Sequence, residues 1–259
     1  MAAQLQLRER ATLLADLQQI VQAMKNLALA ELQRLQHSQP ALAEALRTLE
    51  AAWGRLAEPP AAAAQEGGCI WLVIGAERGF CGAFNAHLAE AVDILHGTPG
   101  QTVWLAGQRL AEAWQAGRTT GAADGPPAHR LLPGCGALDE AEPVLAAWLQ
   151  AVIDLAAEAA AGTLPPAVCL LSTGPEGLRS QRLLPSPGPA QAWQGLPPGP
   201  APLRGPAAGG APGATPRLGL PRPVLMAAVL HQMVRVQLRA ALETSLVQEN
   251  HARLAQMQR

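Results

Sequence analysis

The feature that most constrains the fold is a long helical pattern at each end of the chain. Residues 5–56 contain no glycine before Gly54, and apolar residues recur there at steps of three and four. Residues 224–259 contain neither glycine nor proline and repeat the pattern. At 1.5 Å per residue, residues 5–37 alone span about 50 Å, whereas a domain of roughly 115 residues has a radius of gyration near 13–14 Å. The two helices must therefore project from any such domain, and pairing with each other buries their apolar seams most simply.

Pro40 stands inside the first pattern. Proline lacks the amide donor of a helix and clashes with the preceding turn, so we expect a kink or a break near Pro40. Ser38 stands where a new helix would need its N-cap.

The middle of the chain has a different pattern, in which apolar strands alternate with helices. We expect strands at 69–75, 102–107 and 167–172, with an edge strand at 178–185, and helices at 84–95, 109–115 and 140–161. This alternation predicts a Rossmann-like, three-layer α/β head domain over residues 68–184. Proline and glycine dominate residues 185–223, which predicts a flexible connector. The chain thus divides into a helix at 1–60, the head, the connector, and a second coiled-coil helix at 224–259.

Composition limits the classes of partner. The net charge is −1, so no strong field draws the chain to nucleic acid, and no apolar run or leader pattern predicts a membrane span or secretion. We therefore expect a soluble, cytoplasmic chain. The four cysteines form no C-x-x-C pair, so we expect free thiols and no metal site.

The stretch "GAERGFCGAFN", residues 75–85, follows an apolar strand and looks like a phosphate-binding loop. A Walker loop requires G-x-x-x-x-G-K-[ST], but the first spacing is one residue short and no lysine follows. The dinucleotide pattern G-x-G-x-x-G is also absent. We interpret Gly79 and Gly82 as residues that permit a tight strand-to-helix turn, in which Gly79 is required if its φ is positive, and Asn85 as a local hydrogen-bonding group near the helix start. We find no catalytic constellation and expect no cofactor.

Three motifs, in order along the chain, resemble the gamma subunit of F-type ATP synthases. "IVQAMKNLALAELQRLQ" (20–36) is similar to its N-terminal signature, "ERGFCGAFN" (77–85) to its glycine-rich loop, and "ENHARLAQM" (249–257) to its C-terminal motif. The matching positions that the resemblance assigns to subunit contacts are Met24, Lys25, Arg34, Arg78, Gly79, Cys81, Gly82, Asn85, Glu249 and Arg253.

The resemblance implies a non-catalytic rotor stalk, whose terminal helices form an antiparallel coiled coil. Its partners would be the alpha and beta subunits, which surround the helices, and the epsilon subunit and the ring of c subunits, beside which the head sits. The implied location is peripheral, on the cytoplasmic face of a bacterial membrane, with membrane contact only through the complex. The glycine loop would then face the levers of the beta subunits.

The chain also departs from that family pattern. Gln22, Glu31 and Gln33 stand at basic positions of the signature, which weakens an electrostatic contact with acidic levers and leaves it to Lys25 and Arg34. These departures suggest a divergent branch, such as the N-type, sodium-translocating ATPases. The family helix continues beyond the position of Met257, so we expect either a truncated sequence or a branch with a shorter C-terminal helix.

Two other functions remain open at this stage. The strand and loop at 70–82 also suit a nucleotide-binding α/β enzyme with helical dimerisation arms. The helices alone suit a coiled-coil scaffold, which would form a stable homodimer.

Overall fold

A computed structural model describes residues 2–56, 68–118, 129–159, 167–184 and 219–258. Most of the predicted connector, 185–223, therefore lies outside the described residues, as do residues 57–67 between the first helix and the head. The elements in chain order are α1 (Ala2–Leu56), β1 (Cys69–Ile74), α2 (Phe84–His96), β2 (Gln101–Ala106), α3 (Gln108–Arg118), β3 (His129–Leu132), the 3-10 turn η1 (Leu138–Glu140), α4 (Ala141–Ala159), β4 (Ala167–Gly174), β5 (Gly177–Leu184) and α5 (Arg222–Gln256).

The strands form one five-stranded sheet in the order β3-β2-β1-β4-β5. The first four are parallel, and β5 runs antiparallel to β4 at the edge. The apolar runs of β1, β2 and β4 have buried side chains on both faces, as parallel strands covered by helices require. The edge strand that the sequence predicts is confirmed as β5. The short β3 is not among the predicted strands.

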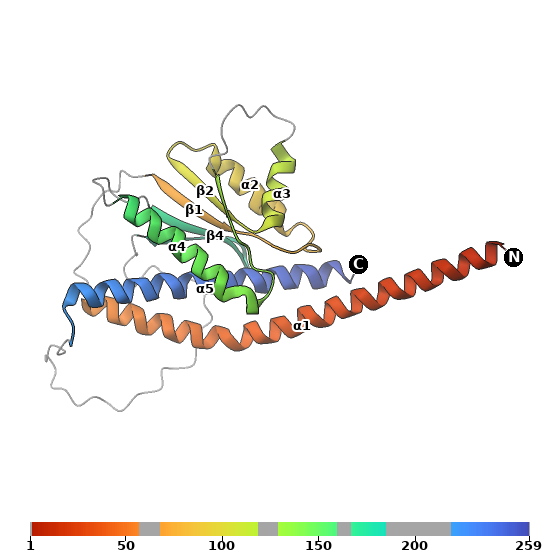
Figure 1. Cartoon of the computed structure of the whole chain (residues 1–259), viewed down its shortest axis with the longest axis horizontal. Helices are drawn as coiled ribbons and strands as arrows, with labels where there is room; N and C mark the ends of the chain where they lie inside the picture. The colour runs from red at the N-terminus through yellow and green to blue at the C-terminus, as the bar shows by residue number, and fades with distance from the viewer. Residues whose placement is uncertain (1, 57–67, 119–128, 160–166, 185–218, 259) are drawn as a thin grey trace.

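Helices cover both faces of the sheet, which confirms the predicted three-layer head (Figure 1). On one face, α2 and α3 pack through Leu88 and Trp114 against side chains such as Val73. On the other face, α4 contributes the fully buried Trp148 and α5 contributes Leu238. The sheet together with α2, α3 and α4 is here called the head.

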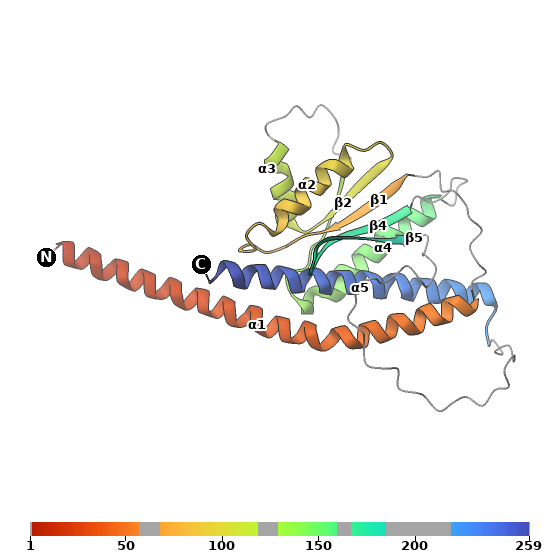
Figure 2. The same ribbon diagram turned by 180° about the vertical axis from the view of Figure 1, so that it is seen from behind.

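The pair formed by α1 and α5, here called the shaft, is antiparallel (Figures 1 and 2). The seam is apolar, with Leu35 and Leu46 of α1 and Leu238 and Leu246 of α5 all at 2 % exposure or less. At its far end, the side chain of Arg222 donates two hydrogen bonds to the carbonyl of Leu56, at 2.8 and 2.6 Å. The predicted pairing of the terminal helices is confirmed.

The N-terminal part of α1 extends past the end of α5 in both views (Figures 1 and 2). Its apolar side chains are exposed, as at Leu7, Leu13, Leu14, Leu17 and Ile20. None of the helices in the described ranges combines the length and the apolar character needed to cross a membrane.

Pro40 lies inside α1, and the helix continues through it. The ribbon curves along its length but does not break (Figure 1). Leu35 and Leu46, on either side of Pro40, are both buried in the seam, so packing on α5 supports the helix across the position that lacks an amide donor.

Candidate functional site

The three sequence motifs meet at one junction between shaft and head. There, α1 and the last turns of α5 pass the loop that joins β1 to α2 and the loop that precedes η1. Between them lies a cavity of about 290 Å³. Its lining comes from all four segments: Met24, Leu27, Ala28 and Glu31 of α1; Arg78, Gly79 and Phe80; Gly136 and Ala137; and Asn250, Arg253 and Met257.

The loop after β1 turns through two residues with positive φ. These are Gly82, with φ of 56°, and Phe80, with φ of 62°. Gly79 does not have a positive φ, and a Cβ there would find no heavy atom nearer than 3.9 Å. The condition under which Gly79 would be required, a positive φ, is therefore not met, whereas Gly82 does have a positive φ. Phe80 adopts an unusual conformation for a large side chain, and that side chain is 68 % exposed.

Asn85, in the first turn of α2, closes the loop from inside. It is buried, and its Oδ1 accepts a hydrogen bond from the amide of Ala76 at 3.0 Å. The amide of Gly75 donates to the carbonyl of Ala106 at 2.8 Å. The first two amides after the strand are thus already paired and are not available to a phosphate. The predicted role of Asn85 as a local hydrogen-bonding group is confirmed.

Arg78 faces the head. Its guanidinium forms an ion pair with Glu140 at 2.7 Å, and the other Glu140 oxygen accepts the Gly136 amide at 2.8 Å. A Cβ at Gly136 would lie 2.3 Å from the Nε of Arg78, so a larger residue there would displace the Arg78 side chain. Sequence reasoning identified Arg78 but missed Glu140 and Gly136, because their proximity depends on the tertiary fold.

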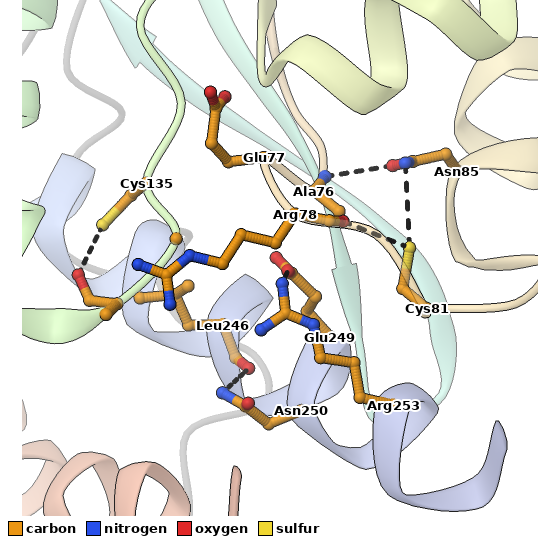
Figure 3. A network of polar contacts seen from close by, with 12 residues as sticks. Ala76, Glu77, Arg78, Cys81, Asn85, Cys135, Leu246, Glu249, Asn250 and Arg253 are labelled. Atoms are coloured by element: carbon orange, nitrogen blue, oxygen red, sulfur yellow. Dashed lines mark hydrogen bonds and ion pairs between the residues drawn. The ribbon is translucent and has the colours of Figure 1, made fainter. Parts of the chain in front are cut away.

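Glu249 and Arg253 form a buried ion pair one turn apart on α5 (Figure 3). Burial raises the pKa of Glu249 to about 7, although Arg253 and Arg78 act in the opposite direction. Cys81 is buried beside this pair, and its pKa is raised by burial and by the charge of Glu249. The C-terminal motif therefore lies beneath the glycine loop.

Glu31 has a role that the sequence did not indicate. It is buried, and its carboxylate accepts a hydrogen bond from the amide of Leu138, which ties α1 to η1. Arg34, one turn later, is mostly exposed and lies 3.9 Å from the other Glu31 oxygen. The acidic side chain at this signature position is thus directed into the head.

Met24 and Lys25 are half-buried on α1. Met24 lines the cavity, whereas Lys25 does not.

The junction brings together eight of the ten predicted contact residues; Lys25 and the exposed Arg34 are the two that it leaves out. Four of the eight line the cavity: Met24, Arg78, Gly79 and Arg253. The other four lie next to it in the loop, α2 and α5: Cys81, Gly82, Asn85 and Glu249. Within the described ranges, no group of three or more His, Cys, Asp or Glu side chains could hold a metal ion.

This architecture, a two-helix shaft packed on an α/β head, has counterparts among known proteins. The central stalk and c-ring structure of the mitochondrial ATP synthase of Tetrahymena thermophila contains a chain that matches at 15 % identity with a TM-score of 0.55, over 92 % of this chain and 98 % of that one. The rotor of the Euglena gracilis mitochondrial enzyme matches at 14 % identity with a TM-score of 0.54, over 97 % and 88 % of the two chains. At these identities, the matches establish the fold.

The family model described as ATP synthase matches residues 4–134, half of the chain. No curated protein sequence gives a significant match. The chain therefore belongs to the ATP synthase family. Within that family, its long terminal helices and α/β head are the architecture of the gamma subunit, the central stalk.

Proposed function

We propose that this chain is the central rotor of a rotary ATP synthase or ATPase and transmits torque between a membrane ring and a catalytic hexamer. The observation that carries the proposal is the junction itself. Three motifs that are far apart in sequence pack on one another where the shaft meets the head, and each of them resembles a gamma-subunit motif. In this role the chain carries out no chemistry, and the catalytic sites belong to the beta subunits.

The projecting part of α1 supports enclosure by other subunits. Leu13, Leu17 and Ile20 are each at least 48 % exposed, and the polar residues between them are mostly glutamine and carry little charge. A helix that stayed in water would normally carry more charge. Alternating alpha and beta subunits that surround the helix would cover these apolar side chains.

The outer face of the junction is the proposed contact with the beta-subunit levers. Phe80 is exposed there, and Lys25 and Arg34 supply positive charge on α1. The Glu31 carboxylate accepts the Leu138 amide and also lies 3.9 Å from Arg34, so it offsets part of the Arg34 charge and leaves Lys25 as the main source of positive charge on this face. An acidic lever would therefore meet an apolar and basic surface.

The head is the proposed binding surface for the remaining partners, the epsilon subunit and the ring of c subunits. In that arrangement, the chain is peripheral on the cytoplasmic face of a bacterial membrane and reaches the bilayer only through the complex. Gln22, Glu31 and Gln33 at basic positions of the signature support placement in the N-type, sodium-translocating branch. Sodium-stimulated ATP hydrolysis by the assembled complex would support this placement, and proton-dependent activity without a sodium response would exclude it.

Co-expression with matching alpha and beta subunits tests the central proposal. We expect a complex that contains one copy of this chain per hexamer, measured by native mass spectrometry. A chain that never enters the hexamer overturns the proposal. Calorimetry of the isolated chain with ATP and NAD addresses the alternative enzyme function, because saturable binding at the glycine loop would favour it. A stable homodimer in light scattering would favour a coiled-coil scaffold.

A further inference from the structure

Glu243 is a carboxylate in the middle of the apolar shaft. Its side chain is 1 % exposed. Ser38 of α1 donates a hydrogen bond to Glu243 Oε2 at 2.6 Å, and Arg239 donates to Glu243 Oε1 at 2.9 Å. Both carboxylate oxygens are therefore satisfied, one by each helix of the shaft.

The same arginine continues the contacts into the head. Arg239 Nη1 donates to Glu142 Oε1 at 2.6 Å, and Arg235 binds Glu142 Oε2 at 2.7 Å. Glu142 lies in the first turn of α4. Ser38, Glu243, Arg239 and Glu142 thus form a continuous polar chain from α1 through α5 to α4.

An apolar seam alone specifies helix register weakly, because shifts by one heptad again place apolar residues opposite each other. In this antiparallel pair, such a shift would replace Ser38 opposite Glu243 with Ala45 or with Glu31. Ala45 offers no side-chain donor, and Glu31 would bring a second negative charge. Either register leaves a buried carboxylate without its partner, which is strongly unfavourable.

We propose that the polar chain fixes the register of the shaft and joins the shaft to the head, so that the two turn as one body. This inference rests on the proposed rotor function. The four residues are positioning residues, since they act by holding α1, α5 and α4 in place. The exposed part of the chain, at Glu142, contributes little by itself, and the buried Ser38–Glu243 contact is its centre.

The decisive variant is Glu243→Leu in the assembled complex. Arg239 is partly exposed and keeps its ion pair with Glu142, so this replacement leaves no buried charge without a partner, and a merely structural role predicts normal behaviour. We expect the thermal midpoint to be unchanged or higher, whereas ATP synthesis driven by the ion gradient is lost while hydrolysis persists. Spin labels at the exposed positions Thr48 and Gln232, which lie opposite each other in this register, report a shift of one helix along the other. A shift of seven residues moves one label about 10 Å along the axis, so we expect a second population with a longer label distance.

A second pair of variants keeps the test valid if Glu243→Leu fails to fold. Ser38→Ala removes the donor on α1 but leaves the Arg239 pair, and it should show the same loss of coupling in a weaker form. Ser38→Thr restores a hydroxyl and should restore coupling. The matched control is Glu44→Gln, which breaks an exposed ion pair with Arg47 on the same helix and should change neither readout.

The inference is overturned if Glu243→Leu and Ser38→Ala both show one label distance and both couple ATP synthesis to the ion gradient normally. Failure of the wild-type chain to join the hexamer would instead overturn the rotor function. In that case, the label distances in the isolated chain still decide whether the polar chain fixes the register.

Discussion

The guanidinium of Arg253 lies against the carboxylate of Glu249, one helical turn before it on α5, and both side chains are at most 10 % exposed. Burial nevertheless raises the pKa of Glu249 to about 7, well above the ordinary value of 4.5. Because the folded chain then holds its proton more tightly than the unfolded chain, the contribution of Glu249 to stability is greatest below pH 4.5 and is lost as the pH rises through 7.

This relationship predicts the pH dependence of unfolding. The free energy of unfolding should fall between about pH 5 and pH 8, with at most about 3 kcal/mol attributable to Glu249. Glu249→Gln should flatten this part of the profile, as measured by guanidinium unfolding at several pH values. The exposed Glu90→Gln serves as the control and should leave the profile unchanged. An equally steep profile in Glu249→Gln would show that another group titrates.

Asn85→Ala should destabilise the chain. It removes the acceptor of the buried Ala76 amide, and an unsatisfied buried donor costs about 1–3 kcal/mol. Denaturant unfolding measures this loss. The matched control is Asn26→Ala, which removes only an exposed contact with Gln22 on α1 and should stay within about 0.5 kcal/mol of wild type. Equal effects of the two substitutions would contradict the role assigned to Asn85.

The two glycines of the loop should respond differently to the same substitution. Gly82→Ala places a Cβ at φ of 56° and should lower the free energy of unfolding by roughly 1–2 kcal/mol. Gly79→Ala makes only an ordinary contact with Arg109 at 3.9 Å, at a φ that is not positive, and should change the free energy of unfolding by less than about 0.5 kcal/mol. Because both sites lie in one loop and receive the same side chain, a larger loss at Gly79 would overturn the assignment of strain.

Lys25→Glu should impair ATP synthesis by the assembled complex without unfolding the chain. Lys25 is the only lysine and lies on the half-buried face of α1, and reversal of a surface charge typically changes stability by no more than about 1 kcal/mol. Gradient-driven synthesis and circular dichroism measure the two effects. Lys25→Arg keeps the charge and should couple normally, whereas normal coupling in Lys25→Glu would remove Lys25 from the lever contact.

Cys169 should be the most reactive thiol among the four. Its sulfur lies 3.2 Å from that of Cys69, which donates a hydrogen bond to it. That hydrogen bond lowers the pKa of Cys169, burial opposes the shift, and Arg182 adds to it, whereas the same contact raises the pKa of Cys69. Alkylation at neutral pH, followed by peptide mass spectrometry, should modify Cys169 first, and Cys69→Ala should slow that reaction. Faster labelling of Cys69 would reverse the assignment.

Much of the fold could be predicted because its elements have strong local patterns. The apolar runs of β1, β2 and β4 and the periodicity of α1 and α5 each identify an element without tertiary information. The strand β3 was missed because it has only four residues and begins with His129 and Arg130. The guanidinium of Arg130 lies over the ring of Trp104 on β2, with its Cζ 5.3 Å from the ring centroid. No local sequence pattern contains this contact.

The site was predicted residue by residue but not as an assembly. The motifs identified Arg78, Asn85 and Arg253, while their convergence depends on antiparallel pairing of helices that are about 200 residues apart. The positive φ of Phe80 could not be foreseen, because large side chains rarely adopt it. The inward direction of Glu31 also follows from the position of η1, which lies more than a hundred residues later in the chain.

The helix α5 belongs to two packed layers at once. One flank meets α1, while the other covers β1 and β4 and carries Val234 and Leu238 into the core of the sheet. Residues 68–184 on their own would keep α4 on that face of the sheet but would expose the part that α5 covers, so the α/β unit is not an independent module. If related stalks exchanged heads, in evolution or by design, the C-terminal helix would have to be transferred together with the sheet. Each exchange would therefore also replace one of the two helices of the shaft.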